Sequence, residues 1–289
     1  MPLSALGLIV AAAFIHASWN LLIKRAEGGG AFVWLFSLAS AVVYAPLVIT
    51  LMVLEPLDYG VWEVGLILSS GVLHLLYAVT LNHGYRVGDL SVVYPVARGT
   101  GPLVSTIGAI LLLGERPSAL GVLGILLVVS GILCIAGAWP LARLRSSVKA
   151  AKGLSYGLLT GLCIAAYTVN DAYAVKVLLV SPIMIDYFGN LVRLILLTPP
   201  ILTDRAALRS EWKKNWKIAA GAGALMPLSY ILSLFAMRLA PVSYVAPARE
   251  LSMLVGAWFG AKLLGEGHTR QRLIGAALMI GGIVGLALS

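Results

Sequence analysis

The stretch YPVARGTGPLVSTIGAILLLGE at Tyr94–Glu115 is repeated later in the chain as APARELSMLVGAWFGAKLLGE at Ala246–Glu266. The LLGE endings lie 151 residues apart, and so do Arg98 and Arg249, which each stand inside an otherwise apolar run. A charged side chain in membrane hydrocarbon costs about 2.5–3.5 kcal/mol even on insertion scales, so such residues usually serve function. Two arginines at matching places predict one site built from the two halves of a duplicated chain.

The composition of the chain indicates a membrane protein. Of its 289 residues, 60% are hydrophobic and only 11% are charged, and the mean hydropathy is +0.95. Soluble proteins carry about 25% charged residues, so this chain has too few polar groups to cover a soluble fold. Cys134 and Cys163 both lie in apolar runs, which favours small core residues over a disulfide or a zinc site.

Ten apolar runs are long enough to cross a hydrocarbon core of about 30 Å, which takes about 20 helical residues. The runs are continuous, whereas the strands of a membrane barrel alternate between apolar and polar residues. We therefore predict an all-α membrane protein with ten transmembrane helices and no soluble domain. The predicted spans are residues 3–23, 31–54, 61–82, 90–113, 118–139, 153–175, 181–203, 217–237, 241–264 and 273–288.

The internal match extends beyond the two quoted stretches. Lys24 matches Lys176 at an offset of 152 residues, close to the offset of the two arginines. The chain then divides into two five-helix repeats, over residues 1–142 and 153–289. Because five is an odd number, the second repeat enters the membrane from the opposite side. We predict two inverted repeats, which is the arrangement of many secondary transporters.

The net charge of +9 belongs to the connections between spans rather than to a nucleic-acid surface. Fourteen of the 21 Lys and Arg residues lie in the connections after the odd-numbered spans, and three lie on the other side. The positive-inside rule therefore places those connections in the cytoplasm and both termini outside. We expect a multi-pass protein of a bacterial-type inner membrane, in contact with the lipid bilayer, without a nucleic-acid partner, and either monomeric or weakly dimeric.

The order of these features resembles the ten-helix EamA type of the drug/metabolite transporter superfamily. The resemblance covers essentially the whole chain and rests on the two five-helix halves, the HASWN motif at His16–Asn20, the prolines of the fourth and ninth spans, and the two LLGE endings. It implies a secondary carrier, most often an exporter of amino acids or other metabolites. It also implies cytoplasmic termini, against the charge count. HASWN followed by LLIKRA is similar to a subgroup associated with phosphonate utilisation.

A carrier needs a polar site near the middle of the membrane, usually where helices are interrupted. A proline lies shortly before each arginine, Pro95 in the fourth span and Pro247 in the ninth, and each frees a backbone carbonyl. The planar fork of Arg98 or Arg249 suits a carboxylate or a phosphonate, so we predict that they bind an anionic group. Pairing within the protein is the alternative. Because Glu250 directly follows the second arginine, we expect Arg98 to be the freer of the two.

Polar and aromatic residues at helical spacing complete the predicted substrate site. Hydrogen bonding between helices is the alternative role for these groups. Proton coupling requires a buried carboxylate or histidine, and Asp171 and Glu250 are the best placed. The other predicted substrate-binding residues are His16, Trp19 and Asn20 in the first span, His74 and Tyr77 in the third, Tyr94 in the fourth, and Tyr167 and Asn170 in the sixth.

Three further polar residues, Asp186, Asn190 and Arg193, form a stripe in the seventh span that is interpreted as internal pairing. The LLGE glutamates, Glu115 and Glu266, are interpreted as turn and interface residues, with a gate as the alternative.

Motifs of enzymes are absent from the sequence. It has no P-loop, no metal-ligand spacing among its four histidines and no sodium-site signature, so we expect no enzymatic activity, no cofactor and no metal. The prediction is a secondary active transporter, an exporter or exchanger, of a small polar metabolite such as an amino acid, organic anion or phosphonate. It would work by alternating access, with the two halves rocking about the site. The alternatives are an antiporter of sugar phosphates or nucleotide sugars, and a non-transporting scaffold or flippase partner.

Overall fold

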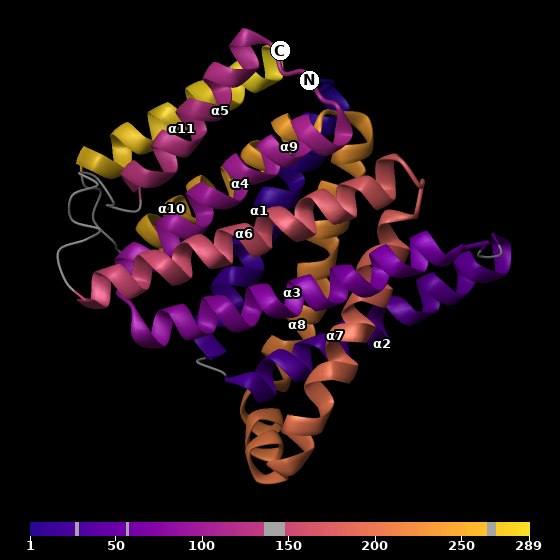
Figure 1. Cartoon of the computed structure of the whole chain (residues 1–289). Helices are drawn as coiled ribbons and strands as arrows, with labels where there is room; N and C mark the ends of the chain where they lie inside the picture. Colours follow the sequence, from indigo (N-terminus) through magenta and orange to yellow (C-terminus); the bar gives the residue numbers. More distant parts are fainter. Residues whose placement is uncertain (27–28, 56–57, 136–147, 265–269) are drawn as a thin grey trace.

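The structure, a computed structural model, describes residues 1–26, 29–55, 58–135, 148–264 and 270–289 and confirms the all-α membrane fold (Figure 1). Within these residues, eight helices are long and apolar enough to cross a membrane. The shorter apolar α5 provides a further crossing, and α9 with α10 provides the tenth. The helices are α1 (Leu3–Ala26), α2 (Gly30–Leu54), α3 (Val61–Val87), α4 (Leu90–Leu113), α5 (Ala119–Ile135), α6 (Val148–Lys176), α7 (Pro182–Thr203), α8 (Arg205–Leu239), α9 (Val242–Ala248), α10 (Leu251–Leu264) and α11 (Arg270–Leu288).

The largest difference from the predicted spans is at α8, which begins at Arg205 rather than at residue 217. The carboxylate of Asp204 caps this helix by accepting a hydrogen bond from the Ala207 backbone N–H over 3.0 Å. At about 1.5 Å per residue, its 35 residues extend about 50 Å, well beyond a hydrocarbon core of about 30 Å. The charged beginning of α8 therefore continues the helix outside the core.

Eight of the ten described crossings pack into two four-helix bundles, and each bundle takes two crossings from each repeat. The α1–α8 bundle contains α1, α2, α8 and the α9–α10 crossing, and the α3–α6 bundle contains α3, α4, α6 and α7. The helix contacts of one bundle have counterparts in the other. The contact of α1 with α8 corresponds to that of α6 with α3, and the contact of α2 with α8 corresponds to that of α7 with α3. The two repeats are therefore interleaved in space.

Glycines permit the closest helix contacts, as expected for helices that associate in a membrane. A Cβ atom on Gly157 of α6 would lie 2.8 Å from the Cβ of Val96 in α4. On the edge of the protein, α5 packs along α11, where a Cβ on Gly124 would lie 2.8 Å from the carbonyl oxygen of Gly282. Larger side chains at these positions would force the helices apart.

The two repeats enter the membrane from opposite faces, as predicted. The two termini lie together, and the Met1 ammonium donates a hydrogen bond to the carbonyl of Ala287 over 3.0 Å (Figure 1). The second repeat begins on the other face, where Lys149 lies 3.4 Å from Asp89 at the start of α4. We call these the termini face and the opposite face.

The assignment of the opposite face to the cytoplasm stays a prediction. Two of the cations counted for it, Arg143 and Arg145, lie outside the described residues.

Candidate functional site

The ninth crossing is interrupted at two charged residues. α9 ends at Ala248, Arg249 and Glu250 form a turn, and α10 begins at Leu251. The turn is tight, because the Glu250 N–H donates to the carbonyl of Pro247 over 3.1 Å, three residues back. The break thus introduces a cation and an anion from one short stretch of backbone into the interior of the helix bundle.

The proline before the break explains part of this geometry. Pro247 has no N–H to donate to the carbonyl of Ser243, and the hydroxyl of Thr106 in α4 lies 3.4 Å from that oxygen as its donor. In the first repeat, α4 stays helical through Pro95. The predicted interruption is therefore present in the second repeat and wrong for the first.

The two arginines have partners opposite to those expected. Nε of Arg98 lies 3.2 Å from Oε2 of Glu250, across the boundary between the bundles. Arg249 instead has its guanidinium carbon 5.1 Å from the centre of the Tyr230 ring, and within the described residues no carboxylate oxygen lies within 4.0 Å of it. The expectation that Arg98 would be the freer arginine is wrong, because adjacent residues of a helical turn point in different directions and Glu250 faces α4.

The ion pair between Arg98 and Glu250 is buried but weakly bonded. The two side chains are only 17% and 7% exposed, yet their facing atoms lack the geometry of a hydrogen bond. The guanidinium of Arg98 also lies 5.8 Å from the ring centre of Tyr94 in the same helix. Charge attraction alone therefore holds this contact, and both groups retain unused hydrogen-bonding capacity.

Four rings from three helices pack around the arginines. His74 of α3 stacks on Tyr167 of α6, with ring centres 4.1 Å apart, and Tyr77 meets Tyr167 edge-on at 5.8 Å. Tyr230 of α8 lies 5.2 Å from His74 and 6.1 Å from Tyr167. The structure thus brings together three predicted site residues and adds Tyr230, which the sequence reading missed. The available signal was a group of hydroxyl side chains, including Ser229 and Ser233, in an apolar span.

Asp171 is fully buried beneath these rings. One of its carboxylate oxygens accepts a hydrogen bond from the Tyr230 hydroxyl over 2.6 Å, and the other accepts one from the Asn170 amide over 2.9 Å. The Asn170 carbonyl in turn accepts a hydrogen bond from the Ser69 hydroxyl over 2.7 Å. Asp171 is therefore held by neutral donors.

The HASWN motif contributes packing next to this cluster. The rings of His16 and Trp19 meet at 4.7 Å, and the indole N–H of Trp19 donates to the hydroxyl of Ser229 in α8 over 3.3 Å. Asn20 is exposed, and its predicted place in the substrate site stays a prediction. The motif therefore fastens α1 to α8 within one bundle.

The polar stripe of α7 has hydrogen-bonding partners of its own. Arg193 donates to the side-chain oxygen of Asn190 over 2.6 Å, and the Asn190 amide donates to the carbonyl of Ser37 in α2 over 2.9 Å. In the described part of the chain, Asp186 is not within 4.0 Å of Arg193, and the two charges attract each other at longer range. Internal pairing of the stripe is confirmed for Asn190 and Arg193 only.

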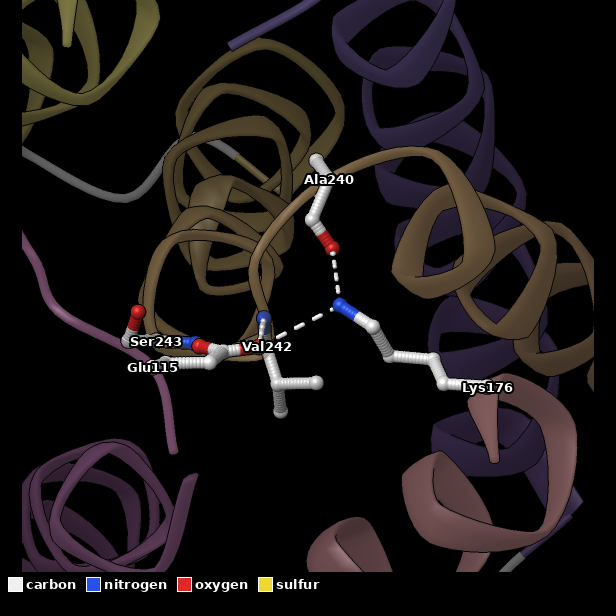
Figure 2. Close-up of polar contacts among 5 residues, drawn as sticks. All are labelled: Glu115, Lys176, Ala240, Val242 and Ser243. Carbon is white, nitrogen blue, oxygen red and sulfur yellow. Dashed lines mark hydrogen bonds and ion pairs between the residues drawn. The ribbon is translucent and has the colours of Figure 1, made fainter. Parts of the chain in front are cut away.

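A second polar cluster joins helix ends at the termini face (Figure 2). The two carboxylate oxygens of Glu115 accept hydrogen bonds from the backbone N–H groups of Val242 and Ser243, over 2.7 and 2.9 Å. Lys176 lies 3.2 Å from Glu115 and donates to the carbonyl of Ala240 over 2.9 Å. We call these five residues the termini-face seal, because they join the ends of α4, α6 and α8 to the start of α9.

The environment of Glu115 favours its charged form. Burial alone raises the pKa of its carboxyl, but the two backbone N–H groups and the ammonium of Lys176 outweigh burial and lower this pKa below its usual value. Glu115 follows the end of α4, as expected of a turn residue, and its role as an interface or gate residue stays a prediction. Its counterpart Glu266 lies outside the described residues.

Comparison with known proteins gives two adjacent matches to one family. The EamA-like transporter family model matches residues 3–137 and 151–288. The chain belongs to the EamA-like transporter family. It is therefore a multi-pass membrane transporter of a small molecule, built from two EamA repeats, and not an enzyme. The repeat boundaries at 1–142 and 153–289 stay predictions.

Solved structures share the fold of this EamA transporter. A crystal structure aligns with a TM-score of 0.75 at 15% sequence identity, over 99% of this chain and 98% of that chain. It is one of 29 solved chains that match. At this identity the likeness concerns the fold alone. No curated protein matches the chain.

Proposed function

We propose that this EamA transporter is a secondary active exporter or exchanger of a small polar metabolite with an anionic group, such as an amino acid, an organic anion or a phosphonate. The observation that carries the proposal is Arg249, a guanidinium at a helix break that has an aromatic ring beside it and, within the described residues, no carboxylate in ion-pair range. An unpaired charge inside a membrane protein is unfavourable. A substrate carboxylate or phosphonate would supply the missing acceptors in a bidentate geometry.

The neighbouring groups support a substrate with more than one polar end. The Arg98–Glu250 pair lacks hydrogen-bond geometry, so a substrate can replace either partner at low cost. A second anionic oxygen would draw Arg98, and an ammonium group would draw Glu250. The rings of Tyr167 and Tyr230 supply a flat apolar wall for the body of the substrate.

Alternating access then follows from contacts that cross between the bundles. Arg98 with Glu250 and Tyr230 with Asp171 join the bundles at the centre, and Glu115 joins them at the termini face. The moving bodies of this mechanism are the two mixed bundles and not the two sequence halves, because the halves are interleaved. Opening the termini face requires the seal at Glu115 to separate.

Proton coupling would act through the same central contacts. Glu250 and Asp171 each link the two bundles, and protonation of Glu250 would abolish its attraction to Arg98. A proton and a substrate anion would then compete for the same cross-bundle contacts, which is the requirement for coupled movement.

A ligand screen followed by transport tests this proposal. Amino acids, organic acids and phosphonates are added to the purified transporter, and compounds that raise its melting temperature are then tested for counterflow in proteoliposomes. We expect such a compound to stabilise and cross with the wild type but not with Arg249→Ala. Arg238→Ala removes an exposed arginine at the end of α8 and should behave as wild type. Normal transport by both Arg249→Ala and Arg98→Ala would refute the anion site.

A further inference from the structure

The first turns of α8 carry a basic and aromatic face. Arg205, Arg209, Trp212, Lys213 and Trp216 follow the spacing i, i+4, i+7, i+8 and i+11, which places them on one side of a helix. All five are exposed, and the two tryptophan rings stack with centres 6.4 Å apart. In Figure 1 this end of α8 projects with the α7–α8 connection beyond the neighbouring helices. This basic and aromatic side of α8 therefore lies at the opposite face of the protein, which places it near the membrane surface.

This face borders a groove against the start of α2. The groove encloses about 280 Å³, and apolar atoms of Trp34, Leu35 and Leu38 form the wall on α2. The indole N–H of Trp34 donates to the hydroxyl of Thr198 in α7 over 2.9 Å, which fixes the position of that wall. Across the groove lie Leu208, Arg209, Trp212 and Lys213 of α8. An apolar slot is thus combined with two exposed cations at its edge.

The charge of the surrounding segment selects the kind of ligand. Between residues 205 and 217, five Lys and Arg residues stand against one carboxylate, Glu211, which accepts a hydrogen bond from the Asn215 amide over 2.6 Å. Basic clusters next to a membrane span attract anionic lipid headgroups, and tryptophans favour the headgroup level. A small soluble anion would use the cations but would leave the apolar wall unoccupied.

We propose that the groove between α2 and α8 binds an anionic phospholipid. One acyl chain lies along Trp34 and Leu38, and Arg209 and Lys213 hold the phosphate and headgroup. Trp212 packs beside the ester region at the edge of the groove. This site is separate from the proposed substrate site and does not depend on which substrate is carried.

The test measures lipid binding by the purified full chain in phosphatidylcholine nanodiscs with and without phosphatidylglycerol. The double variant Arg209→Gln/Lys213→Gln is compared with Lys152→Gln/Lys214→Gln, which removes the same charge from exposed side chains on the same membrane face outside the groove. Native mass spectrometry should show retained phosphatidylglycerol in the wild type and in the control. The groove variant should lose affinity for it about 30-fold, which corresponds to about 1 kcal/mol per cation removed.

A second variant separates the groove from charge and from folding. Leu38→Trp fills the slot and keeps both cations, and it should also lose the lipid, while all variants should melt as wild type does in phosphatidylcholine alone. Equal losses in the groove variant and the charge control would overturn the proposal, because any surface cations would then suffice. Wild-type binding without preference for phosphatidylglycerol, or equal stabilisation by glycerol phosphate, would also overturn it.

Discussion

The fourth and ninth crossings occupy the same place in the two repeats and carry matching arginines, yet they differ in backbone and in charge balance. α4 is continuous, and Arg98 is neutralised by a carboxylate from the other bundle. The ninth crossing is broken, and Arg249 lies against an aromatic ring. Glu250 accounts for the difference. It directly follows Arg249 in the sequence but pairs with Arg98 of the other repeat. The two matching arginines therefore have different surroundings because of one residue that the repeats do not share.

The largest effect is expected when Arg98, the arginine that pairs with a carboxylate, is removed. Arg98→Ala leaves Glu250 buried without its cation, and losing one partner of a buried pair costs about 3–5 kcal/mol, with the low end expected here because Arg98 is 17% exposed. Denaturation in mild detergent should report this loss. The double variant Arg98→Ala/Glu250→Ala should recover most of it, and failure to recover would mean that Arg98 stabilises the fold by other contacts.

A charge-preserving change sharpens the contrast between the two arginines. Arg249→Lys keeps the positive charge but loses the planar fork, so the affinity for a carboxylate substrate should fall about 10-fold, the value of one charge-assisted hydrogen bond. Arg98→Lys should change that affinity less, because its contact with Glu250 is a single approach of 3.2 Å. The substrate affinity of both variants is measured by equilibrium binding. Equal losses of affinity would show that both arginines bind the substrate.

The ring of Tyr230 lies beside Arg249, and its hydroxyl bonds to Asp171, so the two contacts can be tested separately. Tyr230→Phe keeps the ring under Arg249 and removes the donor to the buried Asp171. Loss of this hydrogen bond should lower stability by about 1–3 kcal/mol, since the acceptor remains buried. Substrate affinity should change little compared with Tyr230→Leu, which also removes the ring. The two variants are compared by thermal melting and by ligand binding.

The smallest effect is expected at the termini-face seal, through its pH dependence. The pKa of Glu115 is lower in the folded protein than its ordinary value, so its stabilisation is present at neutral pH and is lost as the pH falls through the lowered folded-state pKa. The loss should be about 1 kcal/mol, because the group is partly screened by solvent. Glu115→Gln should be less stable than the wild type at pH 7. Its melting temperature, measured over a series of pH values, should not show this loss of stability at acidic pH.

Much of the fold could be predicted because apolar length alone defines a membrane crossing. The runs at 31–54 and 90–113 correspond closely to α2 and α4. The early start of α8 was missed because its first turns are charged and lie outside the hydrocarbon, where hydropathy carries no signal. The interleaving of the repeats was also missed, because the order of spans along a chain does not determine which spans pack together.

Most members of the candidate site could be predicted from the sequence, but their pairing could not. Polar groups such as His74 and Asp171 in apolar spans had to face protein rather than lipid, so their gathering follows from sequence. The pairing of Arg98 with Glu250 depends on how α4 is rotated toward a break in another bundle, and no local pattern reports that rotation. Tyr230 was missed because an uncharged ring in an apolar span resembles ordinary core.

The interleaved packing has a mechanical consequence. The chain passes directly from one bundle to the other only between α2 and α3 and between α7 and α8, because α5 leads from α4 to α6 of the same bundle. These two connections lie at opposite faces of the membrane, and in the proposed mechanism they would act as a pair of hinges. Asp204 stiffens the second hinge by capping α8, and the proposed lipid groove begins one turn beyond it. The lipid composition of that leaflet would thus set the stiffness of one hinge and leave the other unaffected.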